Sequence, residues 1–114
     1  DKRLYCAGAL AEMYEKMGGS TLYFGKPHPP IYDLARRRLT EAGGRPDPQI
    51  LCIGDGIATD VQGGIAEGLD TLFITGGLEA ERFGPDVEAP EAGLLLDWLA
   101  GRELSPSYAI GRLR

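Results

Sequence analysis

Residues 50–53 read Ile-Leu-Cys-Ile, and the chain turns directly after them through Gly54, Asp55 and Gly56. A short unbroken apolar run predicts a strand buried on both faces, as in the middle of a parallel sheet. Because Asp55 follows this strand at once, its carboxylate is expected at the carboxyl end of the sheet, where open α/β folds bind their ligands. The stretch therefore predicts an α/β fold with a parallel sheet and an acidic group at its ligand-binding edge.

A helix is predicted to begin soon after this turn. Thr59 and Gln62 have the spacing of a capping box, with Thr59 as the N-cap residue and the helix starting near Asp60. Turn chemistry and a favourable negative charge at a helix N-terminus would each explain Asp55 or Asp60 alone. A carboxylate fixed at the end of a buried strand also suits Mg²⁺, which takes one or two protein carboxylates together with water and phosphate oxygens. Both interpretations are open at this point.

The composition disfavours several classes of function. The chain has 114 residues, enough for one domain or part of one, and a formal net charge of −5. Phosphate backbones are bound by clustered Lys and Arg, and the one basic run, residues 36–38, is expected to be the solvated face of a helix. No apolar run approaches the roughly 18 residues of a membrane span, and residues 1–4 lead into no signal-type segment. We expect a protein that binds neither nucleic acid nor membranes.

Cysteine and histidine are too scarce to build a site by themselves. Cys6 and Cys52 are too few for a disulfide framework, and neither has the spacing of a metal site. Both lie among small or apolar residues, so we expect them to be reduced and buried, in a cytoplasmic protein. His28 is the only histidine, which leaves no histidine metal cluster and no serine triad. It could contact a substrate or shape its turn.

The remaining segments alternate predicted helices and strands. Helices are expected over residues 4–17, 29–42 and 90–99, and strands over residues 21–24, 71–74 and 108–110. The small residues 6–9 indicate close packing or a backbone that approaches an anion. Gly63 and Gly64 each cost a helix about 1 kcal/mol relative to alanine, so the helix after Thr59 must pack closely against the sheet.

Lys26 stands between Gly25 and Pro27, at the end of the predicted strand 21–24 and so at the same edge as Asp55. A lone lysine at such a place is commonly just solvated. It is not the lysine of a phosphate-binding P-loop, which needs glycine five residues before its Gly-Lys pair, where this chain has Ser20. A dinucleotide fingerprint fails as well, because residues 54–59 lack the third glycine and would place a carboxylate against the diphosphate.

Two stretches resemble the third and fourth motifs of the haloacid dehalogenase-like (HAD) hydrolases: Tyr-Phe-Gly-Lys-Pro-His-Pro-Pro-Ile-Tyr at residues 23–32 and Ile-Gly-Asp-Gly-Ile-Ala-Thr-Asp at residues 53–60. The similarity is greatest to the class IIA branch, which includes 4-nitrophenylphosphatase-like and sugar-phosphate phosphatases. Residues 5–11 are similar to the segment by which that branch re-enters its core after the cap domain. The resemblance implies a Rossmann-like, three-layer α/β/α core with a parallel sheet.

The same resemblance implies a Mg²⁺-dependent phosphatase for small phosphate esters, with catalytic roles for Lys26, Asp55 and Asp60. Asp55 would bind the metal, and Asp60 would order the groups around it. Lys26 would hold the nucleophile and the substrate phosphate, with Gly25 and Pro27 beside it at the phosphate. Phosphoryl transfer asks mainly for positioning and charge compensation, which one metal ion and one ammonium can supply while an aspartate attacks and forms an aspartyl-phosphate.

The attacking aspartate of this family belongs to an Asp-x-Asp motif, and this sequence contains none. We therefore expect residues 1–114 to be the carboxyl-terminal part of a HAD-like core, without the amino-terminal part of the core and without the cap, and inactive alone. Because the cap supplies most selective contacts in that branch, the substrate stays open beyond a small phosphorylated metabolite. A homodimer is among the assemblies left open.

Two further interpretations belong to other functional classes. A non-catalytic descendant would keep the fold to bind a phosphorylated ligand or a protein partner. A receiver-like phospho-acceptor domain would share the parallel sheet, the acidic cluster and the lysine. It is disfavoured because its lysine follows the acceptor strand, whereas Lys26 precedes Asp55.

Overall fold

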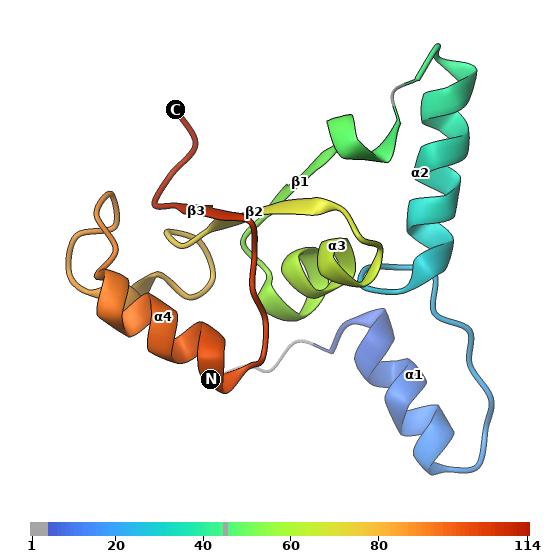
Figure 1. Ribbon diagram of the computed structural model, residues 1–114. Helices are drawn as coiled ribbons and strands as arrows, with labels where there is room; N and C mark the ends of the chain where they lie inside the picture. Colours follow the sequence, from blue (N-terminus) through green and yellow to red (C-terminus); the bar gives the residue numbers. More distant parts are fainter. Residues whose placement is uncertain (1–4, 45) are drawn as a thin grey trace.

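The computed structural model describes residues 5–44 and 46–114. In this part of the chain the sheet has three parallel strands in the order β1-β2-β3, namely β1 (Leu51–Gly54), β2 (Asp70–Ile74) and β3 (Tyr108–Ile110). Its α-helices are α1 (Ala7–Lys16), α2 (Pro29–Glu41), α3 (Gln62–Ala66) and α4 (Ala92–Gly101). Figure 1 shows α3 and α4 against the strands and α1 apart from them. The predicted α/β class with a parallel sheet is confirmed.

The hydrophobic core lies between the sheet and α4. Phe73 of β2 is fully buried, and its ring meets Phe83 edge-on with 6.1 Å between centroids and stacks on Trp98 at 6.0 Å. The guanidinium of Arg102 covers the outer face of the Trp98 ring at 4.4 Å from its centroid. Trp98 is thus the core anchor expected from its helix, and the buried apolar side chains that complete this cluster are Ile57, Val61, Leu95 and Leu99.

Phe73→Leu should lower the free energy of unfolding by about 1–2 kcal/mol, because the smaller side chain leaves space between Phe83 and Trp98 that the surroundings fill only in part. Phe24→Leu is the matched control, since Phe24 is 63% exposed and touches no core residue of the cluster. Urea titration of both variants measures the difference. Equal loss in both variants would contradict the assigned core.

Strand β1 is less buried than its sequence predicts. Leu51 is 43% and Ile53 is 49% exposed, so the expectation of a strand buried on both faces is wrong in this structure. The reason is that successive side chains of a strand point to opposite faces of the sheet, and the described helices cover only one face of β1. Cys52 points to the face that α3 covers, whereas Leu51 and Ile53 point to the face that no described element covers. The described residues do not form the second helical layer that the resemblance implies.

Helix α3 packs closely on the sheet because of its two glycines. Gly63 and Gly64 are both buried, and a β-carbon on Gly64 would come within 3.1 Å of the Cys52 β-carbon and would also meet Thr71. The predicted close packing of this helix on the sheet is therefore confirmed. Gly68, with φ of 70°, then ends the helix in a conformation that favours glycine.

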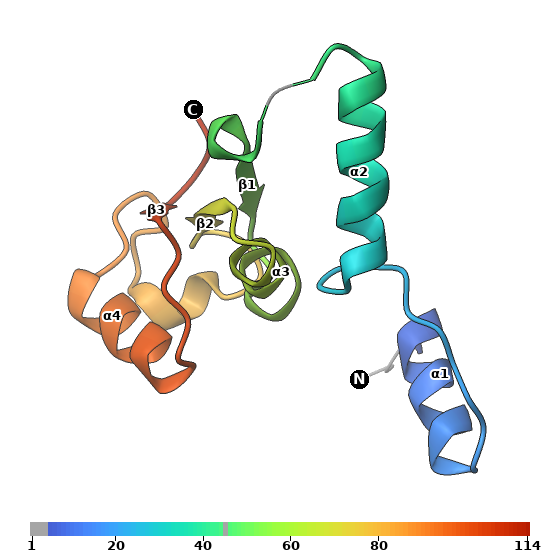
Figure 2. The ribbon, with the colours of Figure 1, turned by 45° about the vertical axis from the view of Figure 1, so that its right-hand side comes forward.

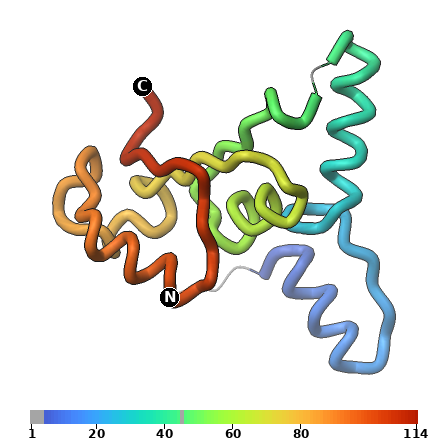
Figure 3. Tube along the Cα trace, in the orientation of Figure 1, coloured from blue at the N-terminus to red at the C-terminus, as the bar shows by residue number. Residues whose placement is uncertain are grey.

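The segment of residues 21–24, predicted as a strand, has no regular structure. Figures 1 and 3 show it as the blue stretch that returns from α1 to α2 at a distance from the sheet. A strand needs a neighbour that takes up its backbone hydrogen bonds. Among the described residues, the neighbour of residues 21–24 is helix α1, whose Glu15 accepts hydrogen bonds from Thr21 and Tyr23, and a helix cannot take up the backbone hydrogen bonds of a strand.

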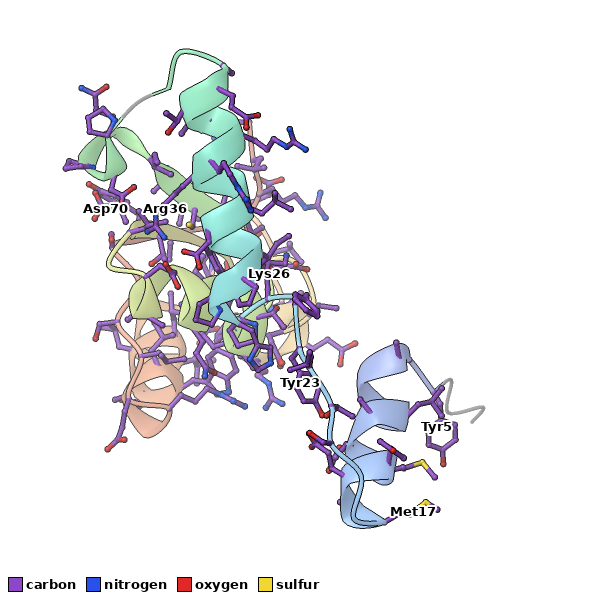
Figure 4. The ribbon with its side chains drawn as sticks, turned by 90° about the vertical axis from the view of Figure 1, so that its right-hand side faces the viewer. Tyr5, Met17, Tyr23, Lys26, Arg36 and Asp70 are labelled. Carbon is purple, nitrogen blue, oxygen red and sulfur yellow. The ribbon has the colours of Figure 1, made fainter. Side chains whose placement is uncertain are left out.

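Helix α1 forms where its apolar spacing predicts, but its apolar side chains stay exposed. Tyr5 is 67% and Met17 is 82% exposed, and both point away from the rest of the molecule in Figure 4. The expected start at Leu4 lies outside the described residues. The radius of gyration is 16.4 Å, whereas a compact domain of this length has roughly 13 Å. Extension of α1 and α2 away from the sheet explains the difference, as Figure 2 makes clear.

Both cysteines are free, as expected for reduced thiols, yet only one is partly buried. Cys52 lies between α3 and the sheet, where burial raises the pKa of its thiol. Cys6 is exposed, so the prediction that it is buried is wrong; it precedes a helix that buries none of its residues. Over residues 5–44 and 46–114, no helix is long and apolar enough to cross a membrane.

Candidate active site

The turn after β1 carries both acidic residues predicted for the site. Residues 57–61 form a π-helical turn that leads into α3, and the Gly56 carbonyl accepts the amides of Asp60 at 2.8 Å and Val61 at 3.1 Å. The predicted capping box is wrong: helical structure begins at Ile57, and no side chain caps it. Asp60 reaches back instead, and its Oδ2 accepts the Gly56 N–H at 3.0 Å. This bond fixes Asp60 beside the end of β1.

The side chain of Asp55 is fixed by the loop that follows β2. The backbone N–H of Leu78 donates to its Oδ2 at 3.0 Å, and a β-carbon on Gly77 would collide with the Asp55 side chain. Because β1 and β2 are parallel, the loop after β2 arrives at the same edge as Asp55. The half-buried carboxylate therefore has a fixed orientation and keeps Oδ1 for another partner.

Lys26 reaches this edge from the loop before α2. Its Nζ forms an ion pair with Oδ1 of Asp60, and the Lys26 side chain is 52% exposed against 14% for Asp60. The hydrogen bond to Asp60 raises the pKa of the Lys26 ammonium, which partial burial opposes and the nearby Asp55 carboxylate adds to. Lys26 therefore stays charged across the neutral pH range. The structure brings Lys26, Asp55 and Asp60 together, as their sequence positions predict.

The residues around Lys26 shape its loop. Gly25 accepts the His28 N–H at 3.0 Å, and the Lys26–Pro27 peptide bond is cis. The His28 ring stacks on Tyr23 with 5.0 Å between centroids, directly before α2 begins. Of the two interpretations of His28, this geometry favours the one in which it shapes the turn. Figure 4 shows Lys26 at the base of α2 and Tyr23 below it.

The donor set fits Mg²⁺ better than a transition metal. Among the described residues, no group of three or more His, Cys, Asp and Glu side chains could enclose an ion. Asp55 and Asp60 offer carboxylate oxygens at one exposed edge, and no thiolate or imidazole accompanies them. Mg²⁺ is the cation that sites with one or two carboxylates, water and substrate phosphate suit. Asp55 would hold it directly, and Asp60, already engaged by Lys26 and Gly56, would stay beside it.

Sequence reasoning missed two contributors to this site and the ion pairs of Arg36 behind it. The Leu78 amide is a backbone group, so no residue type could signal it. The two glycines directly before it, Gly76 and Gly77, were the one sequence feature that indicated a turn at this edge. Tyr32 lies near both Lys26 and Asp60, and burial raises the pKa of its hydroxyl. Arg36 is not a solvated member of the basic run, because it pairs with Glu67 and Asp47 and is 29% exposed.

Comparison with known proteins settles the family. A family model described as HAD-hydrolase-like matches residues 23–100, which include Lys26, Asp55 and Asp60. The chain belongs to the HAD-like hydrolases. The motif resemblance in its sequence is thereby confirmed, and so is the HAD-like fold.

Individual relatives agree with this family. The chain is 34% identical over 85 residues to the 5′-nucleotidase YutF of Bacillus subtilis, a match that covers 72% of this chain and 32% of that protein. It is 38% identical to a haloacid dehalogenase-like hydrolase from Brucella suis, with a TM-score of 0.66 over 96% of this chain and 38% of that one. A possible sugar phosphatase from Cytophaga hutchinsonii, 21% identical, shares the fold with a TM-score of 0.64 over 94% of this chain and 34% of its own.

The HAD-like chain described here spans about a third of the length of these relatives. The activities in the names of these relatives therefore belong to longer proteins.

Proposed function

We propose that this chain is part of a Mg²⁺-dependent phosphatase that hydrolyses small phosphate esters through an aspartyl-phosphate intermediate. The observation that carries the proposal is the convergence of Lys26, Asp55 and Asp60, from two separate parts of the sequence, at the carboxyl end of β1. Phosphoryl transfer needs opposite charges fixed around the phosphate, and this edge offers an ammonium and a site for a cation. Family membership and the names of the relatives support the same class of reaction.

The residues of this chain would position and compensate charge. Lys26 would bind a phosphate oxygen with its ammonium, which its pairing with Asp60 keeps charged and aimed at the edge. The Leu78 amide would keep Asp55 oriented, with one carboxylate oxygen directed at the cation. A bound Mg²⁺ would supply positive charge that orients the phosphate and offsets its developing negative charge. Gly25 and Pro27, on either side of Lys26, would bring their backbone close to the phosphate.

The nucleophile would come from outside these 114 residues. We propose that they are the carboxyl-terminal part of a HAD-like core, completed by an amino-terminal part of that core and a cap domain. Three observations support this: the relatives are about three times as long, the sequence has no Asp-x-Asp, and the apolar residues Leu51 and Ile53 lie half-exposed on β1. A small phosphorylated metabolite in the cytoplasm is the expected substrate.

The proposal is tested by a panel of phosphate esters on the full-length protein, with and without Mg²⁺. The panel should hold nucleoside monophosphates, sugar phosphates and 4-nitrophenyl phosphate, since relatives carry nucleotidase and phosphatase names. We expect hydrolysis that chelation by EDTA removes and added Mg²⁺ restores. Absence of hydrolysis for every ester would contradict the proposal.

Residues 1–114 alone should not turn over any ester of that panel, because the chain offers charge compensation and no attacking aspartate. The measurement is phosphate release at high protein concentration over hours. An active 114-residue chain that loses its activity in Asp55→Asn would contradict the view that the nucleophile lies elsewhere.

A non-catalytic protein that binds a phosphorylated ligand is the second candidate. The observation that favours it is the combination of an intact charged edge with no Asp-x-Asp in the sequence. The open reading frame upstream distinguishes the two candidates. An Asp-x-Asp-Gly strand there supports the enzyme, and a substituted motif supports the binding protein.

A further inference from the structure

Two contacts join α2 to α3 and to the residue directly after α3, and they are four residues apart in both segments. The first is made by Gly63 of α3. A β-carbon at this buried glycine would meet the Tyr32 hydroxyl, would lie 2.8 Å from Cζ of that ring, and would lie 3.2 Å from the backbone Cα of Pro27. Ordinary van der Waals contact begins near 3.4 Å, so only glycine lets Tyr32 and the Lys26–Pro27 loop rest on the helix here.

The second contact is ionic. The Arg36 guanidinium pairs with the Glu67 carboxylate and donates to the Glu67 backbone carbonyl at 3.3 Å. It also pairs with Asp47 at 3.0 Å. Side chains four residues apart lie on the same face of a helix, so Tyr32 and Arg36 share one face of α2. Gly63 and Glu67 are their two partners, the latter directly after α3.

We propose that Gly63, Tyr32 and Arg36 are positioning residues that set the place of Lys26 relative to Asp60. Asp60 lies three residues before Gly63, in the turn that leads into α3, and Lys26 directly precedes Pro27, which rests on Gly63. A displacement of Pro27 from α3 therefore also moves the backbone of Lys26 relative to Asp60. The ion pair between these two groups cannot do this alone, because half of the Lys26 side chain is in solvent. The effect of these residues on catalysis rests on the phosphatase proposal.

The test is Gly63→Ala in the full-length protein, with Gly93→Ala as the matched control. Gly93 is a helical glycine of α4 with nothing within 4 Å of a β-carbon position. We expect Gly63→Ala to lower kcat by roughly 10-fold to 100-fold with KM changed less than about threefold, because misplacement of a charged group acts on the transition state. Gly93→Ala should keep the kcat of the parent. Equal kcat for both variants would overturn the proposal.

Removal of the ring that the new methyl group meets should offset part of the loss of kcat caused by Gly63→Ala. In the double variant Gly63→Ala with Tyr32→Leu, the loss of kcat should be smaller than the product of the two single losses, whereas independent sites give losses that multiply. Arg36→Met should likewise lower kcat, and Arg38→Met, whose guanidinium pairs only with Glu41 of its own helix in the described structure, should not. Losses that multiply for Gly63 and Tyr32 would overturn the proposal.

Crystal structures of Gly63→Ala and Gly93→Ala provide a readout that needs no activity. We expect the Lys26–Asp60 ion pair to be broken in the first and kept in the second. An intact pair in Gly63→Ala would overturn the positioning role even in an active phosphatase. If the parent protein hydrolyses no ester and Gly63→Ala still breaks the pair, the phosphatase proposal fails and the positioning role stands.

Discussion

Asp55→Asn should remove the Mg²⁺-dependent phosphatase activity of the full-length protein almost completely. The substitution keeps the size of the side chain and leaves an oxygen for the Leu78 N–H, which lies 3.0 Å from the carboxylate. It removes the negative charge that Mg²⁺ requires from the few protein ligands it takes. We expect kcat/KM to fall by about 10³-fold or more, which corresponds to about 4 kcal/mol of transition-state stabilisation.

Asp97→Asn is the control for this experiment. Asp97 is an exposed residue of α4, far in sequence from the site and without a bond to any side chain in the described part of the chain. It should leave kcat/KM and the Mg²⁺ dependence as they are in the parent. An Asp55→Asn enzyme that keeps full activity at the parental Mg²⁺ concentration would remove Asp55 from the metal site.

Lys26→Met should give the second largest effect. Methionine keeps most of the length of the side chain and loses the ammonium, so the phosphate loses its second positive partner and Asp60 loses its ion pair. We expect kcat to fall by about 10²-fold to 10³-fold, the loss typical of one electrostatic contact to a transition state. Thermal unfolding should change little, since a pair with a half-exposed lysine contributes at most about 1 kcal/mol to stability.

Lys16→Met tests whether loss of any lysine has this effect. Lys16 also forms an ion pair, with Glu12 at 2.7 Å, but on the exposed surface of α1. It should keep the kcat of the parent. A Lys26→Met protein with parental kcat, or one that loses activity only because it unfolds at the assay temperature, would contradict a direct role of this ammonium.

The sequence predicted that Lys26, Asp55 and Asp60 would lie at one edge of the sheet, because their positions follow from the order of local elements. A short apolar run followed by Gly54-Asp55-Gly56 places a carboxylate at the carboxyl end of a parallel strand, whatever the rest of the chain does. The apolar spacing likewise predicted α2, β2 and β3 close to their observed bounds. These signals are local, because each lies within one short segment of the sequence.

What the sequence could not predict depends on contacts with distant segments. Residues 21–24 have the composition of a strand, but a strand forms only beside a partner, and none is described there. The prediction that β1 is buried on both faces also failed for lack of a neighbouring segment, because Leu51 and Ile53 are buried only if a further layer covers them. Arg36 looked like one of three equivalent basic residues until the position of Glu67 was known.

The capping box failed for a more local reason. Thr59 and Gln62 have the right spacing, but Thr59 lies inside the helical turn of residues 57–61, and its N–H bonds to the Gly56 carbonyl. Asp60 binds the backbone at the start of this turn instead, because its Oδ2 accepts the Gly56 N–H. Its other oxygen pairs with Lys26. A carboxylate that serves two partners in this way positions a charged loop, which a simple cap would not do.

The most direct test of this account is a crystal structure of the full-length protein grown with Mg²⁺ and orthovanadate, an oxyanion that mimics the phosphate. The account predicts a Mg²⁺ ion bound directly to an Asp55 carboxylate oxygen and a vanadate beside that ion. The Lys26 ammonium should donate a hydrogen bond to this vanadate from the other side. A metal bound away from Asp55, or a Lys26 side chain turned from the anion, would contradict it.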